Sequence, residues 1–116
     1  MAGSETPCPL DVADGLERAG GEMDFYKELL DLLLEDVPPR IVELRAAAAA
    51  ADPVKVAGVA HAIKGAAANL AATPLREAAL TLEMKGREGV ASGLEPMIER
   101  LDAELGRLAE FVKTIC

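Results

Sequence analysis

Apolar side chains recur at three- and four-residue steps through most of this chain, with polar residues between them. That spacing places the apolar side chains along one face of a helix. No strand-length run alternates β-branched with polar residues. We therefore expect an all-α fold, an antiparallel four-helix bundle with a short additional N-terminal helix. The pattern predicts helices over 9–19, 23–51, 53–71, from 73 until Gly86 and Gly89 end it, and from 94 to the C-terminal end.

Prolines and capping residues set the expected boundaries of these helices. Pro38-Pro39 interrupts the long second helix, because proline lacks an amide and disfavours helical geometry in the preceding residue. We expect a kink or a short break over 36–39, with the apolar stripe continuing in phase. Helix starts, each an N-cap residue or a capping box beside a proline, are predicted at Asp52-Pro53, at Thr73-Pro74 and at Ser92 with Glu95.

The helix expected over 53–71 has an unusual polar side. It carries the only histidine of the chain, His61, with Lys64 one turn later on the same face. Gly58 and Gly65 lie on that face too, although a glycine inside a helix costs about 1 kcal/mol relative to alanine. With Ala57 and Ala68 they form a low surface on which a partner can approach the imidazole. The alternative is that these small residues pack closely against a neighbouring helix.

Glu83 is placed to reach His61 across the hairpin of the third and fourth helices. The turn centres near Ala72, eleven residues after His61 and eleven before Glu83, so both stand at a similar height above it. A carboxylate that accepts a hydrogen bond from Nδ1 would hold the imidazole with its Nε2 lone pair outward. The alternative is that Glu83 pairs with Lys85, Arg87 or solvent.

Other chemistries lack the residues they need. One histidine and two cysteines near opposite termini cannot supply the ligands of a metal site, so we expect none. The serines, Ser4 and Ser92, fall in expected loops, which excludes a hydrolytic triad with His61, and no glycine-rich loop follows a strand to bind a nucleotide. The remaining role for an exposed histidine is that of nucleophile. Lys64 can offset the negative charge of a phosphoryl group transferred to His61.

Composition limits the kinds of binding partner and the cellular compartment that we expect. The formal net charge of −8 disfavours nucleic acid and anionic membrane surfaces, so neither is expected as a partner. The first residues lack a basic region followed by an apolar one, and no eighteen apolar residues run together. We expect a cytoplasmic protein with a flexible N-terminal segment over 1–8 and one domain over 9–116.

The segment Ala60-His61-Ala62-Ile63-Lys64-Gly65-Ala66-Ala67-Ala68-Asn69-Leu70, followed by Leu82-Glu83 and Arg87-x-Gly89, resembles histidine-containing phosphotransfer (HPt) domains of two-component phosphorelays. The resemblance implies that His61 accepts a phosphoryl group on Nε2, that Lys64 supports that group, and that Glu83 orients the imidazole. Gly65 matches the glycine that keeps the face open. Two positions depart from the pattern: Ala66 stands where many members have Ser, and Ala71 where Gly is frequent.

The resemblance also implies a function. Such a domain takes a phosphoryl group from a receiver-domain aspartate and passes it to another, so we expect a monomeric carrier rather than an enzyme. Receiver domains or a hybrid kinase are the expected partners, and Mg²⁺ belongs to the receiver. Docking would use the His61 face and the edge of the first two helices, where Leu10, Leu16 or Phe25 can supply an apolar contact. Two alternatives remain: an interaction module that carries no phosphate, and a structural bundle with an incidental histidine.

Overall fold

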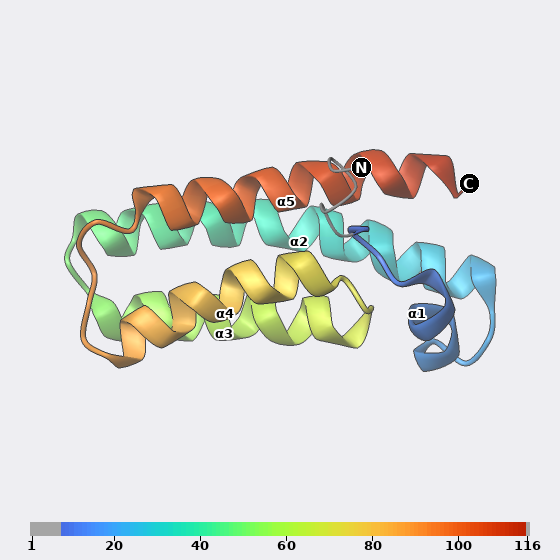
Figure 1. Ribbon diagram of the computed structural model, residues 1–116, viewed down its shortest axis with the longest axis horizontal. Helices are drawn as coiled ribbons and strands as arrows, with labels where there is room; N and C mark the ends of the chain where they lie inside the picture. Colours follow the sequence, from blue (N-terminus) through green and yellow to red (C-terminus); the bar gives the residue numbers. More distant parts are fainter. Residues whose placement is uncertain (1–7, 116) are drawn as a thin grey trace, which may run out of the picture.

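The computed structural model describes residues 8–115, which form five helices and no strand (Figure 1). The all-α fold expected from the apolar pattern is confirmed. The helices are α1 (Val12–Arg18), α2 (Met23–Ala49), α3 (Pro53–Asn69), α4 (Thr73–Arg87) and α5 (Glu95–Thr114).

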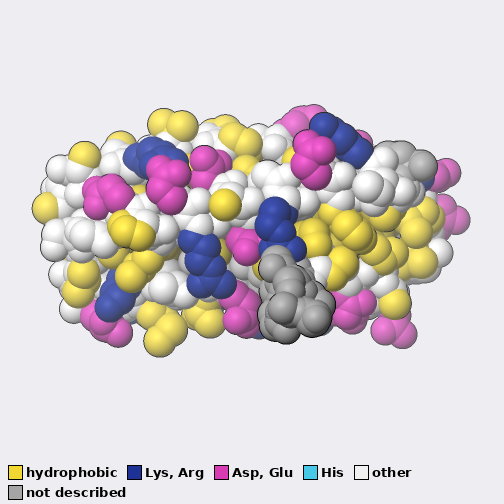
Figure 2. All heavy atoms as spheres, turned by 45° about the horizontal axis from the view of Figure 1, so that its top comes forward, with side chains coloured by type: hydrophobic (Ala, Val, Ile, Leu, Met, Phe, Trp, Pro, Cys, Tyr) yellow, Lys and Arg dark blue, Asp and Glu magenta, His cyan; other side chains and the backbone are white. Residues whose placement is uncertain are grey.

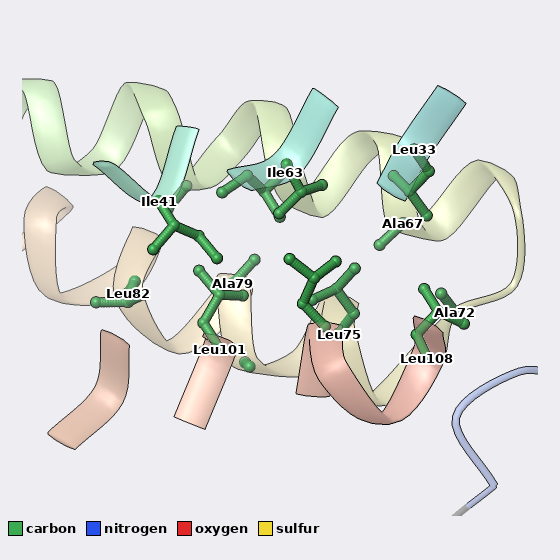
Figure 3. Packing of buried hydrophobic residues seen from close by; sticks show 14 of the residues in the cluster. Leu33, Ile41, Ile63, Ala67, Ala72, Leu75, Ala79, Leu82, Leu101 and Leu108 are labelled. Carbon is green, nitrogen blue, oxygen red and sulfur yellow. The ribbon is translucent and has the colours of Figure 1, made fainter. Parts of the chain in front are cut away.

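The four long helices run antiparallel to their neighbours in sequence, with α2 beside α5 and α3 beside α4 (Figure 1). The helix α1 lies beyond the α3–α4 turn, next to the N-terminal part of α2 (Figure 1). Buried leucine, isoleucine and alanine side chains from all four long helices meet along the bundle axis, as Figure 3 shows for Leu33, Ile63, Leu75 and Leu101. The bundle thus fixes the height of every residue on α3 relative to α4.

The helix α2 runs without a break through Pro38 and Pro39, so of the kink or short break expected there the break is wrong. Both prolines are exposed, so the carbonyl groups that lose their amide partners lie on the solvent side of the helix. The opposite side stays in phase, with Leu33, Val37 and Ile41 all buried. Burial of this stripe therefore holds α2 as one helix.

Three expected helix ends need correction. Of the two glycines expected to end α4, Gly86 lies within the helix, one residue before its last, whereas Gly89 follows the C-cap and ends it. Thr73 is the first residue of α4 rather than its N-cap, and Ala72 occupies the cap position. Ser92 forms no capping box, because α5 begins at Glu95 with Leu94 as its N-cap and no side-chain cap. By contrast, Asp52 caps α3 as expected and accepts from the amide of Lys55.

Each of the first four helices ends in a left-handed residue. These residues are Gly20, Ala51, Ala71 and Gly89, with φ of 87°, 54°, 62° and 82°. The amide of the residue that follows each one bonds back to a carbonyl in the last helical turn, at 2.8 to 2.9 Å. Left-handed backbone suits glycine, because the Cβ of any other residue crowds the carbonyl that follows it. The two alanines are therefore strained at these ends.

The short helix α1 is tied to the α3–α4 turn. The amide of Asp11 donates to the carbonyl of Ala71 at 3.0 Å, and the buried Tyr26 hydroxyl donates to the carbonyl of Leu70 at 2.8 Å. Burial first, and then the nearby carboxylates of α1, raise the pKa of Tyr26 to about 12, so the hydroxyl keeps its proton. Leu10 is buried in the core, which rules it out as a docking contact.

Figure 2 shows the face on which α5 lies forward, where acidic and basic side chains alternate over one end and apolar ones gather over the other. No histidine is visible on that face. Among the helices in residues 8–115, none is long and apolar enough to cross a membrane.

Candidate functional site

The imidazole of His61 projects from α3 toward solvent and is contacted by Glu83 on α4. Its Nδ1 lies 2.9 Å from Oε2 of Glu83, and the carboxylate is an obligate acceptor when ionised, so Nδ1 carries the proton and donates. The His61 side chain is 59% exposed, whereas that of Glu83 is 3% exposed. The contact predicted from the matching heights of the two residues is therefore present, and it leaves the Nε2 lone pair free.

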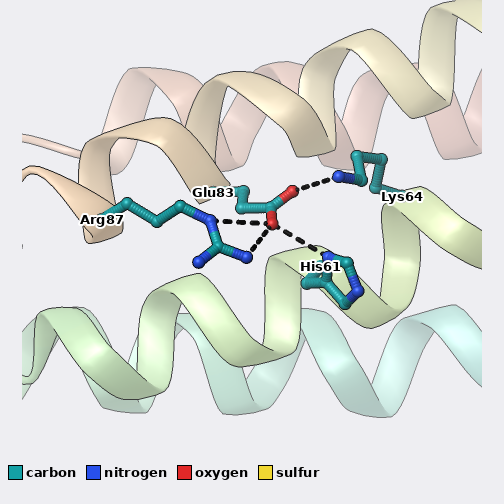
Figure 4. Close-up of polar contacts among 4 residues, drawn as sticks. All are labelled: His61, Lys64, Glu83 and Arg87. Atoms are coloured by element: carbon teal, nitrogen blue, oxygen red, sulfur yellow. Dashed lines mark hydrogen bonds and ion pairs between the residues drawn. The ribbon is translucent and has the colours of Figure 1, made fainter.

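Glu83 gathers three basic groups around one buried carboxylate (Figure 4). Besides His61, the Lys64 ammonium lies 2.7 Å from Oε1, and the Arg87 guanidinium donates to Oε2 from Nε at 3.0 Å and from Nη2 at 2.6 Å. Burial raises the pKa of Glu83, but the hydrogen bonds from Lys64, Arg87 and His61 outweigh burial and lower the pKa to about 2. The carboxylate is therefore ionised at any physiological pH.

Two sequence expectations meet in this cluster. The contacts of Glu83 with His61 and with Arg87 were alternatives, and the structure contains both on the same oxygen. The spacing of Glu83 and Arg87, four residues apart on one helix, was the signal for the second contact. Lys64, expected to support a phosphoryl group, pairs with Glu83 in this structure. From the sequence, Arg87 was considered only as an alternative partner of Glu83, so its part in the site was underestimated.

The face around His61 is open. A Cβ added to Gly58 or Gly65 would meet nothing within 4 Å among the described residues. Packing against a neighbouring helix therefore does not explain these two glycines. A hollow of about 450 Å³ adjoins the imidazole on the side of Gly58, between α3 and the Arg87 end of α4. Both Ala57 and Ala68 are half-buried at the edge of this face.

A larger hollow, of about 700 Å³, lies between α1, α2 and the C-terminal half of α3. Its apolar lining includes Leu29 and Leu32 on α2 and Ala66 on α3. Neither Leu16, which packs against the core, nor the half-exposed Phe25 lines it. The exposure of Leu32 could have been expected from the sequence, because three consecutive leucines on an amphipathic helix cannot all face its core.

No group of three or more His, Cys, Asp or Glu side chains is arranged to hold a metal ion within residues 8–115. The cluster at His61 instead combines one acidic with three basic side chains. A buried carboxylate ringed by cations suits the orientation of an imidazole and the support of added negative charge.

Comparisons with known proteins agree with this geometry. The Hpt domain family matches residues 28–111. The crystal structure of histidine-containing phosphotransfer protein B (HptB) from Pseudomonas aeruginosa PAO1 is similar, with 27% identity, coverage of 95% of each chain and a TM-score of 0.80. The HPT domain from a sensor hybrid histidine kinase of Shewanella shares the fold, with 22% identity, 92% coverage of each chain and a TM-score of 0.77. No curated protein matches the chain in a sequence comparison.

Proposed function

The chain belongs to the family of Hpt domains, the phosphocarrier modules of two-component phosphorelays, and we propose that it carries its phosphoryl group on Nε2 of His61. The observation that carries this assignment is the hydrogen bond between Nδ1 and Glu83, which leaves Nε2 unprotonated on an exposed face. His61 is also the only histidine of the chain.

The transfer step follows from the state of the imidazole. The Nε2 lone pair attacks the phosphorus of an aspartyl phosphate on a receiver domain, so that an N–P bond forms while the P–O bond to the aspartate breaks. The aspartate leaves as a carboxylate, and the ring gains positive charge while Nδ1 keeps its proton. Glu83, ionised and 2.9 Å away, stabilises that charge. Onward transfer to a second receiver is the same step reversed.

Lys64 and Arg87 support the phosphoryl oxygens. Both cationic side chains belong to the cluster at His61, and both contact the single carboxylate of Glu83. A phosphoryl group on His61 brings further negative charge, with which the exposed parts of both side chains can pair. We place the Mg²⁺ of the reaction on the receiver domain and no cofactor on this chain. The chain then acts as a carrier, whereas its partners supply most of the catalytic groups.

Hpt domains interact with receiver domains and hybrid kinases. The apolar hollow beside α3 supports docking of such a partner next to His61, with Leu32 as its most exposed apolar side chain. Ala57, Gly58, Gly65 and Ala68 would be covered in the same complex. The net charge of −8 supports the exclusion of nucleic acid, and we further propose a cytoplasmic monomer.

The decisive experiment is incubation with a phosphorylated receiver domain. The chain should take up acid-labile, base-stable phosphate, and the His61→Gln variant should take up none. Label on His61→Gln would refute the assignment. Binding of the receiver without any label on the wild-type chain, measured by mass spectrometry at neutral pH, would favour the interaction module instead.

Docking is tested with two exposed apolar residues of α2. Leu32→Glu places a charge in the hollow and should weaken transfer from the receiver at least tenfold through KM, since a buried unpaired charge costs well over 1 kcal/mol. Val42→Glu is the matched control, because Val42 is equally exposed but does not line the hollow. Equal effects of the two variants would exclude this hollow from docking.

A further inference from the structure

Gly86 is buried where α4 crosses the first turn of α3. A Cβ built on Gly86 would lie 2.6 Å from the carbonyl oxygen of Pro53 and 2.7 Å from the amide nitrogen of Ala57. These two atoms are four residues apart and thus partners in the helical hydrogen-bond pattern. Since both belong to backbone, neither can turn aside as a flexible side chain would. The backbones of α3 and α4 therefore approach closely only because residue 86 has no side chain.

This close approach lies one helical turn from the contact between His61 and Glu83. On α3, His61 follows Ala57 by four residues, and on the antiparallel α4, Glu83 precedes Gly86 by three. Both steps run in the same direction along the bundle, by about 6 Å and about 4.5 Å respectively. The separation of the helices at Gly86 thus sets the separation across which Glu83 must reach His61.

We infer that Gly86 is a positioning residue, which holds α4 against α3 so that Glu83 can orient the imidazole of His61. The inference rests on the proposed function for its effect on transfer, but its structural part concerns the unphosphorylated chain. An outward shift of about 1 Å would take the 2.9 Å contact between Nδ1 and Oε2 beyond hydrogen-bonding range. The buried carboxylate cannot follow His61, because Arg87 on its own helix holds it.

The consequence is a selective change at the site. Glu83 and Arg87 both lie on α4 and move together, whereas His61 and Lys64 stay with α3. Separation of the helices therefore breaks the hydrogen bond between Glu83 and His61 and lengthens the ion pair with Lys64, but it keeps the contact of Glu83 with Arg87. Loss of the hydrogen bond at Nδ1 also frees the imidazole to place its proton on either nitrogen.

The first test is Gly86→Ala in the unphosphorylated full chain, followed by ¹⁵N NMR of the imidazole at about pH 9, at which free histidine is neutral. The wild type should show the proton on Nδ1 alone, and Gly86→Ala should show it shared with Nε2. Gly106→Ala is the matched control, because Gly106 lies within α5 with nothing within 4 Å of a Cβ. It should leave the imidazole spectrum unchanged. An unaltered spectrum for folded Gly86→Ala overturns the inference.

The second test asks whether Gly86 acts through Glu83. Gly86→Ala should slow transfer from a phosphorylated receiver by about tenfold, since a displacement of about 1 Å can cost up to 100-fold. In the Glu83→Ala background the same substitution should have no further effect on the rate. Multiplying effects in the double variant would overturn the inference, because they would show that Gly86 acts by another route.

A bulkier residue on α3 provides a second variant in case Gly86→Ala does not fold. Ala57→Val adds methyl groups at the same crossing, where the Ala57 Cβ lies 2.9 Å from the position of a Cβ on residue 86. It should shift the imidazole proton in the same way, and an unchanged spectrum would overturn the inference. If the wild-type chain accepts no phosphate on His61, the proposed function fails, while the NMR result still decides the structural role of Gly86.

Discussion

The open face of α3 and the crossing of α3 with α4 use glycine for opposite reasons. Gly58 and Gly65 have empty space where a Cβ would stand, whereas the space beside Gly86 is filled by backbone. All three lie within helices and weaken them by about 1 kcal/mol each relative to alanine. The first two keep room for something outside the described residues, and the third removes room between two parts of the same chain.

The difference shows that a glycine within a helix gains its meaning from what lies over it. At Gly86 the neighbour is part of the fold, so the benefit of the glycine is present in the isolated protein. At Gly58 and Gly65 the fold itself does not require glycine, which agrees with the proposed docking of a partner at His61. Substitution should therefore have opposite effects on stability at the two places.

The largest expected effect comes from filling the open face. Gly65→Gln should lower transfer from a phosphorylated receiver by about 100-fold, because a long side chain beside His61 holds the partner away and a small misplacement is costly. Phosphorylation of His61 by a small phosphoramidate should continue. Gly106→Gln on α5 is the control and should leave both reactions unchanged. Normal transfer by Gly65→Gln would contradict the docking role of this face.

Removal of the carboxylate at the α3–α4 crossing should have a smaller effect on transfer. Glu83→Ala frees the imidazole and loses the charge that stabilises its positive form, so the rate should fall about tenfold, or 1.4 kcal/mol in the barrier. The measurement is single-turnover transfer with circular dichroism to verify the fold. Glu77→Ala, on the exposed side of α4, should transfer at the wild-type rate. Equal rates for the two variants would reduce Glu83 to a structural residue.

The same carboxylate predicts a pH dependence of stability. The pKa of Glu83 is lowered from 4.5 to about 2 in the folded chain, so its stabilisation is complete above about pH 4.5 and is lost as the pH falls toward 2. The free energy of unfolding of the wild type should exceed that of Glu83→Gln at neutral pH, and this excess should shrink by roughly 3 kcal/mol toward pH 2. Urea unfolding at a series of pH values measures it. A constant excess would contradict the shift.

The smallest expected effects are on the free energy of unfolding. They concern two alanines in backbone that favours glycine and, on the open face, a glycine in a helix that favours alanine. Ala51→Gly and Ala71→Gly should each raise the free energy of unfolding by about 1 kcal/mol, because they relieve the left-handed backbone at the ends of α2 and α3. Gly58→Ala should raise it by a similar amount through helix propensity, since its side chain enters open space. Thermal unfolding measures all three. A loss of stability in Gly58→Ala would show that this face is less open than described.

Much of the fold was predictable, because burial requires an apolar stripe and helical spacing makes that stripe visible. The apolar stripe of α3, which includes Val56, Ile63 and Ala67, is buried as its helical spacing requires. The break at Pro38-Pro39 was wrong because local preference was weighed without the burial of Val37 and Ile41, which keeps α2 continuous. Local rules also failed at Ser92, where Leu94 is buried and takes the cap position.

The candidate site was predictable in part. Equal distances from a turn placed Glu83 level with His61, because two antiparallel helices rise equally per residue. The number of partners on Glu83 was not predictable in this way, since it depends on how deeply the carboxylate is buried and on which long side chains can reach it. The hollow beside Leu32 was not predictable for a similar reason, because its lining comes from α1, α2 and α3 together.

The amino-acid sequence by itself determined the helical class, the buried stripes, the polar face with His61 and Lys64, and the height at which Glu83 stands. Each of these follows from the fixed geometry of one helix or of one hairpin. Only the tertiary structure decided that Gly86 lies under α3, that one buried carboxylate holds two cations and the imidazole of His61, and that a hollow opens beside Leu32. These features depend on the distance between helices, which is set by packing among residues far apart in the chain.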